Sequence, residues 1–259
     1  MKSHDFPQKF IEKPISLSIA APAYNEEDSI EEVIDSWIKF LLRQKSFIKK
    51  FEIVICNDGS SDATYSILNK LAHKYKQIRP IHLIQNQGAA SALSIAISNT
   101  KNDWILLLDS DGQFPIENFS LLWDALEKSK AYSAIGIRRK KDSLFTRFGS
   151  YSSGFLCNIF HNSKIKDFNC ALKLSWGPLL RSFNLEAKGM NYSTEITSSI
   201  LRAKVNLVQV LCIHTQRIGG KSKMKLFRDA LHRFLFVLFL GIKIFLVSIK
   251  VLRGLDYEK

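Results

Sequence analysis

Two aspartates that follow an apolar run are the residues best suited to chemistry in this sequence. Asp109 and Asp111 come directly after Trp104–Leu108, whose five large apolar residues predict a strand buried on both faces of a parallel sheet. The carboxylates then lie at the carboxyl end of that strand, the edge where open α/β sheets bind ligands. Such a pair suits Mg²⁺ or Mn²⁺, which bind one or two carboxylates and fill their other positions with water and substrate phosphates. The alternative is an ordinary solvated turn, and other polar groups at the same edge argue against it.

Three further polar clusters precede the acid pair, each after a predicted strand. They occupy 22–27 (Pro-Ala-Tyr-Asn-Glu-Glu), 57–62 (Asn-Asp-Gly-Ser-Ser-Asp) and 86–88 (Asn-Gln-Gly), and the pair itself belongs to 109–113 (Asp-Ser-Asp-Gly-Gln). Taken singly, each has the composition of a turn or an acidic helix start. Four such clusters at successive strand ends predict instead that their side chains converge on one cleft, because parallel strands end at one edge of the sheet.

The elements that position these clusters alternate between strand and helix. The first half predicts strands at 17–21, 51–56, 80–84 and 104–108, with helices at 27–42, from Ser61 or Asp62 to about 75, and at 89–99. The second half is less regular and predicts helices at 119–128 and 191–201, strands at 133–137, 169–174 and 206–213, and an amphipathic stretch at 141–160. This pattern indicates an α/β fold with a Rossmann-like, mostly parallel sheet flanked by helices. The dinucleotide motif G-x-G-x-x-G is absent, which removes the main support for an NAD or FAD enzyme.

The polar clusters resemble the signature of the family 2 glycosyltransferases, which have the GT-A fold. The resemblance is carried by 22–27, 57–60 and 109–111, and it extends over residues 16–223, more strongly in the first half. Gln113-Phe-Pro115, Asp167 and 217–223 (Arg-Ile-Gly-Gly-Lys-Ser-Lys) are similar to the branch that uses polyprenyl phosphates. That branch includes dolichol-phosphate mannose synthases and bacterial undecaprenyl-phosphate glucosyl- and aminoarabinosyltransferases.

The resemblance implies that a nucleotide-sugar donor binds along this edge. Its implied contacts are Pro22, Tyr24, Asn25, Glu26, Asp58, Gly88, Asp109 and Ser110, with Asp58 at the uracil or guanine. Asp109 and Asp111 would hold Mg²⁺ or Mn²⁺ against the donor diphosphate, and Gln113 would lie near the reacting centre, so these three form the implied catalytic set. A cation placed there neutralises the charge that develops on the leaving nucleoside diphosphate. The donor is expected to be a UDP- or GDP-sugar, without a preference between the two bases.

The implied acceptor is a polyprenyl phosphate, either undecaprenyl or dolichyl. Basic residues of the second half would hold its phosphate: Arg138, Arg147, Arg217 and Lys223. A phosphate monoester is already ionised at neutral pH, so its direct attack on the anomeric carbon needs no strong base and inverts the configuration. The rival reaction uses a hydroxyl of a glycan or glycolipid, which needs a base. Asp167 and Glu195 are candidates for that base or for support of the site, and Glu195 also fits an exposed helix position.

Composition narrows the class of partner. The net charge is +13 over 259 residues, with a pI near 9.6, which predicts an anionic partner: nucleic acid, an anionic lipid surface or a phosphorylated substrate. The sequence has no RNP, helix-turn-helix or zinc motif, so nucleic acid is not expected. A non-catalytic membrane scaffold would leave Asp109 and Asp111 unexplained. The four cysteines have no metal-type spacing, which fits a reducing compartment, and Cys56 and Cys212 lie in apolar runs and are expected to be small buried residues.

An apolar, basic-rimmed tail at 224–259 follows a catalytic domain at 1–223, which divides into a nucleotide-sugar half at about 15–115 and an acceptor half at about 116–223. The apolar run 234–249 includes Lys243 and is shorter than the ~20 residues of a clean membrane span. The tail is therefore expected to associate with the membrane interface through amphipathic helices, and 141–160 either joins it or faces the core. Pairing of tails in a homo-oligomer is the alternative. Residues 1–14 have no apolar segment of signal-peptide length, and the enzyme is expected at the cytoplasmic face of the membrane, peripheral or monotopic.

Overall fold

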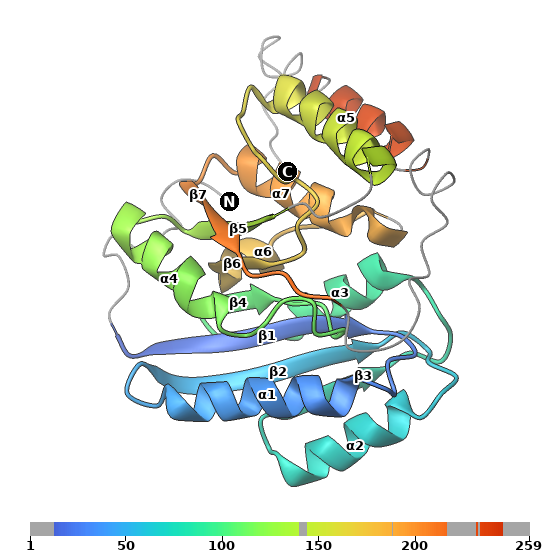
Figure 1. Cartoon of the computed structure of the whole chain (residues 1–259), viewed down its shortest axis with the longest axis vertical. Helices are drawn as coiled ribbons and strands as arrows, with labels where there is room; N and C mark the ends of the chain where they lie inside the picture. The colour runs from blue at the N-terminus through green and yellow to red at the C-terminus, as the bar shows by residue number, and fades with distance from the viewer. Residues whose placement is uncertain (1–12, 140–143, 188, 217–231, 233, 246–259) are drawn as a thin grey trace, which may run out of the picture.

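A seven-stranded sheet forms the centre of the computed structural model, which describes residues 13–139, 144–187, 189–216, 232 and 234–245 (Figure 1). The side chains at 144–152 and at 190 lie outside this description. The strands are β1 (Ile15–Ala23), β2 (Ile48–Asn57), β3 (Ile78–His82), β4 (Trp104–Leu107), β5 (Ser133–Arg138), β6 (Lys173–Trp176) and β7 (Leu207–Cys212). Their order in the sheet is β3-β2-β1-β4-β6-β5-β7.

All strands of this sheet except β6 run in the same direction. β1 pairs in parallel with β2 and β4, β2 with β3, and β5 with β7. β6 is antiparallel to both of its neighbours, β4 and β5. The carboxyl ends of the parallel strands therefore share one edge. Lys173, the first residue of β6, lies at the same edge, opposite Leu107 of β4.

Helices cover both faces of the sheet. They are α1 (Ile30–Arg43), α2 (Thr64–Lys74), α3 (Ala89–Ser98), α4 (Asn118–Ser129), α5 (Leu144–His161), α6 (Gly177–Arg181), the short 3₁₀ turn η2 (Gly189–Asn191) and α7 (Tyr192–Arg202). Phe40 of α1 meets Phe119 of α4 edge-on, with ring centroids 6.3 Å apart, so these two helices cover the same face. α3 leads the chain from β3 back to β4 and lies on the opposite face, where it contacts η2.

The predicted alternation of strands and helices is confirmed, with differences at β3 and in the second half. The strand predicted at 169–174 begins only at Lys173, because the residues before it form a turn. In that turn Asp167 Oδ1 accepts the Asn169 N–H at 3.2 Å, and the Cys170 N–H points to the Asp167 carbonyl at 3.4 Å. β3 also begins two residues before the predicted 80–84. α6 was not predicted, because a helix of five residues that begins with Gly-Pro shows too little periodicity.

A C-terminal helical segment at 234–245 lies beside α5 at one end of the molecule (Figure 1). Val237 of this segment is buried in a small cluster with Cys157 of α5 and Phe168. The backbone at Gly241 packs directly against the side chain of Phe160, since a Cβ at this glycine would lie 2.5 Å from the Phe160 ring. The segment 234–245 is thus packed onto the α/β domain, and α5 faces the core with one side.

The membrane association predicted for the tail is only partly within the described residues. Residues 224–231, 233 and 246–259 fall outside them. Among the helices that the structure describes, none has both the length and the apolar content needed to cross a membrane. All four cysteines of the sequence are buried and free, which confirms the burial predicted for Cys56 and Cys212.

Candidate active site

The loops after β1 and β2 hold each other in place through reciprocal hydrogen bonds. Asn25 has left-handed backbone geometry, with φ of 52°. Its N–H donates to Ser60 Oγ at 2.9 Å, and its side-chain oxygen accepts the Ser61 N–H at 2.9 Å. The Glu26 N–H donates to Thr64 Oγ1 at 2.9 Å. Two residues of the predicted donor set, Asn25 and Glu26, therefore belong to one rigid unit with the second polar cluster.

Asp58 ties the loop after β3 to the same unit. Its side chain is 2% exposed and accepts hydrogen bonds from the N–H groups of Gln87 at 2.7 Å and Gly88 at 2.9 Å, and from the Asn86 amide at 3.0 Å. The carboxylate thus fixes the loop 86–88, which also contains the predicted donor contact Gly88. Asp58 organises this part of the site; its predicted contact with the nucleotide base stays a prediction.

The turn after Asp58 requires a glycine. Gly59 has a φ of 65°, and a Cβ placed on it would lie 2.5 Å from the backbone carbonyl carbon of Gln85. This close approach lets the loop after β3 pack directly on the loop after β2. A side chain here would push the two loops apart.

The acid pair joins the three loops at the end of β4. Ser110 Oγ donates to the Pro22 carbonyl at 2.8 Å, which links the pair to the end of β1. Asp111 is buried, with 4% exposed, and its Oδ1 accepts the Gln113 N–H at 3.0 Å. The structure therefore brings Pro22, Asp109, Ser110, Asp111 and Gln113 together at one edge with the donor loops, as predicted.

Asp109 is half-buried and is held by a residue that the sequence did not single out. Its Oδ1 accepts a hydrogen bond of 2.8 Å from the phenol of Tyr192, the first residue of α7. Burial and the adjacent charge of Asp111 raise the pKa of Asp109 to about 6. Burial and the nearby Asp109 carboxylate also raise the pKa of the Tyr192 phenol well above its usual value, so the phenol remains a hydrogen-bond donor.

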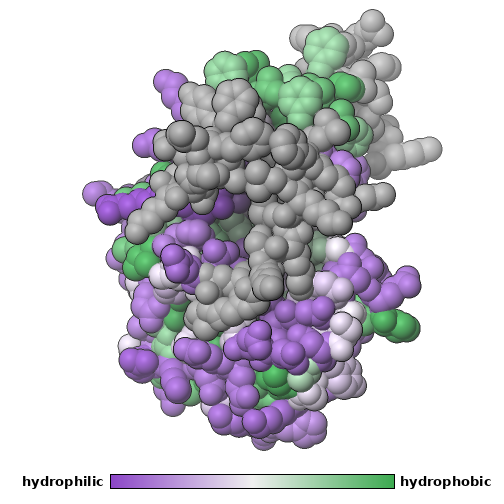
Figure 2. All heavy atoms as spheres, turned by 45° about the vertical axis from the view of Figure 1, so that its right-hand side comes forward, coloured by the Kyte–Doolittle hydropathy of each residue, from purple (hydrophilic) through white to green (hydrophobic). Residues whose placement is uncertain are grey.

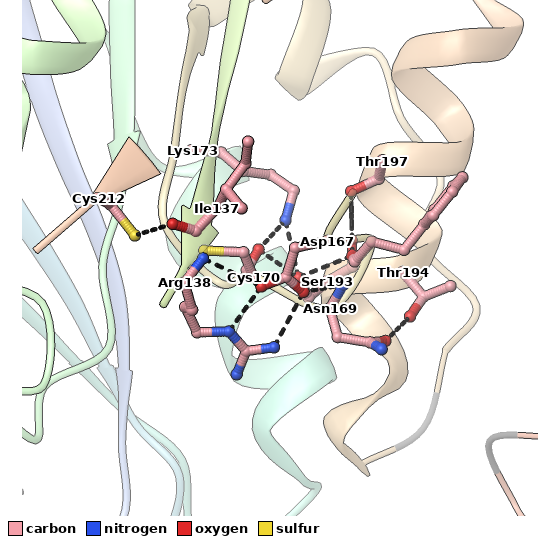
Figure 3. A network of polar contacts seen from close by, with 11 residues as sticks. Ile137, Arg138, Asp167, Asn169, Cys170, Lys173, Ser193, Thr194, Thr197 and Cys212 are labelled. Atoms are coloured by element: carbon pink, nitrogen blue, oxygen red, sulfur yellow. Dashed lines mark hydrogen bonds and ion pairs between the residues drawn. The ribbon is translucent and has the colours of Figure 1, made fainter. Parts of the chain in front are cut away.

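Lys173 is a second residue that was missed. It has no exposed surface, and its ammonium donates to Ser193 Oγ at 2.7 Å and to the Cys170 carbonyl (Figure 3). Burial lowers its pKa to about 8, although the nearby carboxylates of Asp167 and Asp109 favour the charged form. The signal available in the sequence was a lysine inside the apolar run 171–174.

Arg138 and Asp167 form a forked ion pair at the ends of the neighbouring elements. Arg138 Nε lies 2.8 Å from Asp167 Oδ2, and its Nη2 lies 3.0 Å from Oδ1 (Figure 3). The Asp167 side chain is 1% exposed and that of Arg138 is 25% exposed. Both oxygens of the Asp167 carboxylate are engaged by the guanidinium, so the geometry favours site support over the base role for Asp167.

Glu195 supports the loop that precedes η2. Its carboxylate accepts the N–H of Glu186 at 2.9 Å and the N–H of Ala187 at 2.8 Å. Glu195 is only 5% exposed, so the alternative that it occupies an exposed helix position was wrong. The same loop continues to Gly189, whose N lies 3.7 Å from the Cβ position of Gly88. Glu195 thus holds a segment that touches the donor loop.

The rest of the predicted acceptor-phosphate set is not placed by the structure. Arg147 lies in α5, but its side chain is outside the described residues, as are Arg217 and Lys223. Arg138 is therefore the member of that set with a defined position. Its position at the carboxyl end of β5 puts it at the same sheet edge as the acid pair.

The carboxylates present fit a metal of the Mg²⁺ or Mn²⁺ type. Within the described part of the chain, no group of three or more His, Cys, Asp and Glu side chains is arranged to hold a metal ion. Two carboxylates at the end of β4 match instead the hard cations that take only one or two protein carboxylates and complete their shell with substrate phosphates and water. Asp109 and Asp111 are the residues with this chemistry at the edge.

Known proteins resemble this chain in sequence. It is 26% identical over 215 residues to the undecaprenyl-phosphate 4-deoxy-4-formamido-L-arabinose transferase of Edwardsiella ictaluri (strain 93-146), a match covering 82% of this chain and 64% of that protein. It is 28% identical over 241 residues to the dolichyl-phosphate beta-glucosyltransferase of Dictyostelium discoideum, covering 85% and 74% of the two chains. The chain thus spans less than two thirds of the length of the bacterial relative.

Solved structures share the fold. The glucosyl-3-phosphoglycerate synthase of Mycobacterium tuberculosis in complex with UDP has a TM-score of 0.67 at 18% identity, over 88% of this chain and 80% of that one. The same enzyme with Mn²⁺ and UDP-glucose has a TM-score of 0.58 at 19% identity, over 78% and 72%. Residues 18–183 match the domain described as Glycosyl transferase family 2. With the acid pair at the end of β4 and the loops joined around it, this match shows that the chain belongs to glycosyl transferase family 2.

Proposed function

We propose that this enzyme transfers a sugar from a UDP- or GDP-linked donor to undecaprenyl or dolichyl phosphate at the cytoplasmic face of the membrane, with inversion at the anomeric carbon. The observation that carries the proposal is the Asp109–Asp111 pair, which lies at the edge where the loops after β1, β2 and β3 are tied together. Relatives named for transfer to polyprenyl phosphates support the acceptor class.

The donor half follows from the acid pair. Asp109 and Asp111 would hold Mg²⁺ or Mn²⁺, which would neutralise the charge of the leaving nucleoside diphosphate. The Tyr192 phenol fixes the orientation of Asp109, and the Gln113 N–H fixes that of Asp111. Because both carboxylates are held before the donor arrives, little reorganisation is needed when it binds.

The acceptor half rests on Arg138. Its guanidinium is held by Asp167 and lies at the same sheet edge as the acid pair, where it presents fixed positive charge to a phosphate. A lipid phosphate is ionised at neutral pH and can attack without a base. Arg147, Arg217 and Lys223 complete the proposed acceptor set.

The membrane surface is the proposed partner of the apolar face at one end of the molecule. Figure 2 shows apolar side chains gathered at the end that carries α5 and the segment 234–245. Seven of these apolar side chains are exposed, two on α5 and five on the segment 234–245: Phe155, Ile159, Phe234, Leu235, Phe239, Ile242 and Phe245. We call this set the apolar face. A lipid acceptor must be reached at a bilayer, and the net charge of +13 favours an anionic one.

A transfer assay on the purified chain tests the proposed reaction. It uses Mn²⁺ or Mg²⁺, labelled UDP- and GDP-sugars, and undecaprenyl or dolichyl phosphate. The Asp111→Asn variant is expected to lose activity by about 10²-fold or more, because a ligand of the charge-neutralising cation is gone. Asp124→Asn, which alters an exposed carboxylate on α4, is the matched control and should retain activity. Metal-dependent donor hydrolysis without a lipid product would move the acceptor to a hydroxyl, and no donor use would contradict the proposal.

A further inference from the structure

Lys173 is a fully buried lysine at the catalytic edge, and neither the metal-binding nor the acceptor role described above uses it. An ammonium group without exposed surface is unfavourable unless hydrogen-bond acceptors and negative charges surround it. Lys173 has both, because it donates to Ser193 Oγ and the Cys170 carbonyl and lies near the carboxylates of Asp109 and Asp167. The surrounding residues therefore stabilise the buried ammonium of Lys173 at this edge of the sheet.

The reversed direction of β6 explains how a lysine reaches this position. In the sheet, Lys173 lies opposite Leu107 of β4 and opposite Ile135 of β5. Leu107 is two residues before Asp109, and Ile135 is three residues before Arg138. Lys173 therefore starts its strand between the acid pair on one side and the Arg138–Asp167 ion pair on the other.

The hydrogen bonds of Lys173 lead to Asp109 through α7. Ser193 accepts from the ammonium at 2.7 Å and donates to the Cys170 carbonyl at 2.6 Å, so the hydroxyl is used in both directions (Figure 3). These contacts lock the first turn of α7 against the loop before β6. Tyr192, the residue before Ser193, donates to Asp109 at 2.8 Å. A change at Lys173 would thus reach Asp109 through Ser193 and Tyr192.

We propose that Lys173 is a positioning residue for the acid pair, which sets the start of α7 so that the Tyr192 phenol holds Asp109 ready for the cation and the donor diphosphate. The proposal rests on the function proposed above, in which Asp109 is a metal ligand. It assigns no direct contact between Lys173 and substrate. Removal of a group that orients a metal ligand through hydrogen bonds typically weakens metal affinity by about 10- to 100-fold.

Binding of Mn²⁺, alone and with UDP or GDP, tests the proposal without requiring sugar transfer. The free ion is followed by electron paramagnetic resonance in the purified full chain. Lys173→Met, which keeps an unbranched side chain of similar length but removes the charge, is expected to weaken Mn²⁺ binding about tenfold, and Tyr192→Phe by a similar factor. Lys128→Met, an exposed lysine on α4, is the matched control and should bind as the parent does.

The double variant decides whether Lys173 acts through Tyr192. If it does, Lys173→Met with Tyr192→Phe should bind Mn²⁺ no more weakly than either single variant. Unchanged binding in folded Lys173→Met, or two effects that multiply, would overturn the proposal. If Lys173→Met does not fold, Ser193→Ala keeps the ammonium and breaks the link to α7. Unchanged Mn²⁺ binding in folded Ser193→Ala would also overturn it. If the parent chain does not transfer sugar to polyprenyl phosphate but the variants show these effects on Mn²⁺ binding, only the proposed acceptor is contradicted.

Discussion

Tyr192 donates a hydrogen bond of 2.8 Å to Asp109 and thereby joins the first turn of α7 to the end of β4. The two residues are 83 positions apart in the sequence. A carboxylate held in this way keeps one oxygen engaged by the protein, which limits the directions from which a cation can bind it. The geometry of the acid pair thus depends on the second half of the chain as well as on the strand that carries it.

The carboxylate of Asp58 should stabilise the conformation of the loop 86–88. Asp58→Asn replaces one acceptor oxygen by an NH₂ group that faces backbone N–H donors at Gln87 and Gly88. Leaving such donors without an acceptor costs about 1–3 kcal/mol. We expect a lower melting temperature and weaker UDP or GDP binding, measured by thermal unfolding and calorimetry. A variant with parent-like values for both would show that the loop does not depend on this carboxylate.

Gly59 and Gly154 form a matched pair of glycines. Gly59→Ala places a Cβ at 2.5 Å from the Gln85 carbonyl carbon and at a positive φ, so it should destabilise the fold by more than about 1 kcal/mol. Gly154 lies within α5 and has open space around its Cβ position. Gly154→Ala should therefore stabilise the protein by about 0.5–1 kcal/mol. Urea unfolding measures both, and equal effects would contradict the close approach at Gly59.

The Arg138–Asp167 ion pair should contribute far more to the free energy of unfolding than an exposed surface pair. Asp167→Asn removes the anion from a guanidinium that is three-quarters buried, and such losses cost about 3–5 kcal/mol. Glu31→Gln removes the partner of Lys70 in an exposed pair and should cost less than about 1 kcal/mol. Urea unfolding of both variants gives the comparison. A small effect at Asp167 would mean that Arg138 is held by other groups.

His161 should make stability depend on pH. Burial, with a contribution from the charge of Arg202, lowers the pKa of this imidazole to about 4. The unfolded chain has an ordinary histidine pKa of about 6.5 and binds the proton more tightly, so stability is fully present above about pH 6.5 and falls as the pH drops toward 4. His161→Gln should reduce this fall in urea unfolding at pH 7.5, 6.0 and 5.0. His73→Gln, an exposed histidine on α2, should leave it unchanged.

The apolar face should set membrane binding. Phe155 and Ile242 are each more than half exposed, and burial of such side chains contributes about 1.5–3 kcal/mol apiece. The double variant Phe155→Glu with Ile242→Glu should bind anionic vesicles at least about tenfold more weakly in flotation assays. Leu121→Glu on α4 is the matched control, because it is exposed elsewhere. A change in oligomeric state without a change in vesicle binding would identify a second copy as the partner.

The position of the polar clusters at one edge of the sheet was predictable, because each cluster lies next to its strand in the sequence. Each polar cluster follows its own strand, and parallel pairing brings the strand ends together without further information. Asn25, Glu26, Ser110 and Asp111 could therefore be assigned to one edge from spacing alone. The predicted boundaries failed where a buried turn, the one at Asp167–Cys170, contains apolar residues that read as a strand.

The support of the acid pair could not be predicted, because it depends on pairing between distant segments. Arg138 and Asp167 were both singled out, but nothing in the sequence indicated that they bind each other. Tyr192 contacts Asp109 across 83 positions of sequence, and Lys173 lies at the same edge because β6 runs against its neighbours. A single lysine in an apolar run was the one visible sign, and it does not identify its partners.

Under the proposed function, the reversed β6 also separates donor binding from acceptor binding along the chain. β5 ends and β6 begins at the same edge, so the segment 139–172 leaves the sheet and returns to it at one edge. That segment carries α5 and part of the apolar face, whereas the donor loops all precede it. If the proposed function holds and Asp167 and Lys173 stay in place, variation within this segment would change the lipid that the enzyme accepts without changing the nucleotide that it binds.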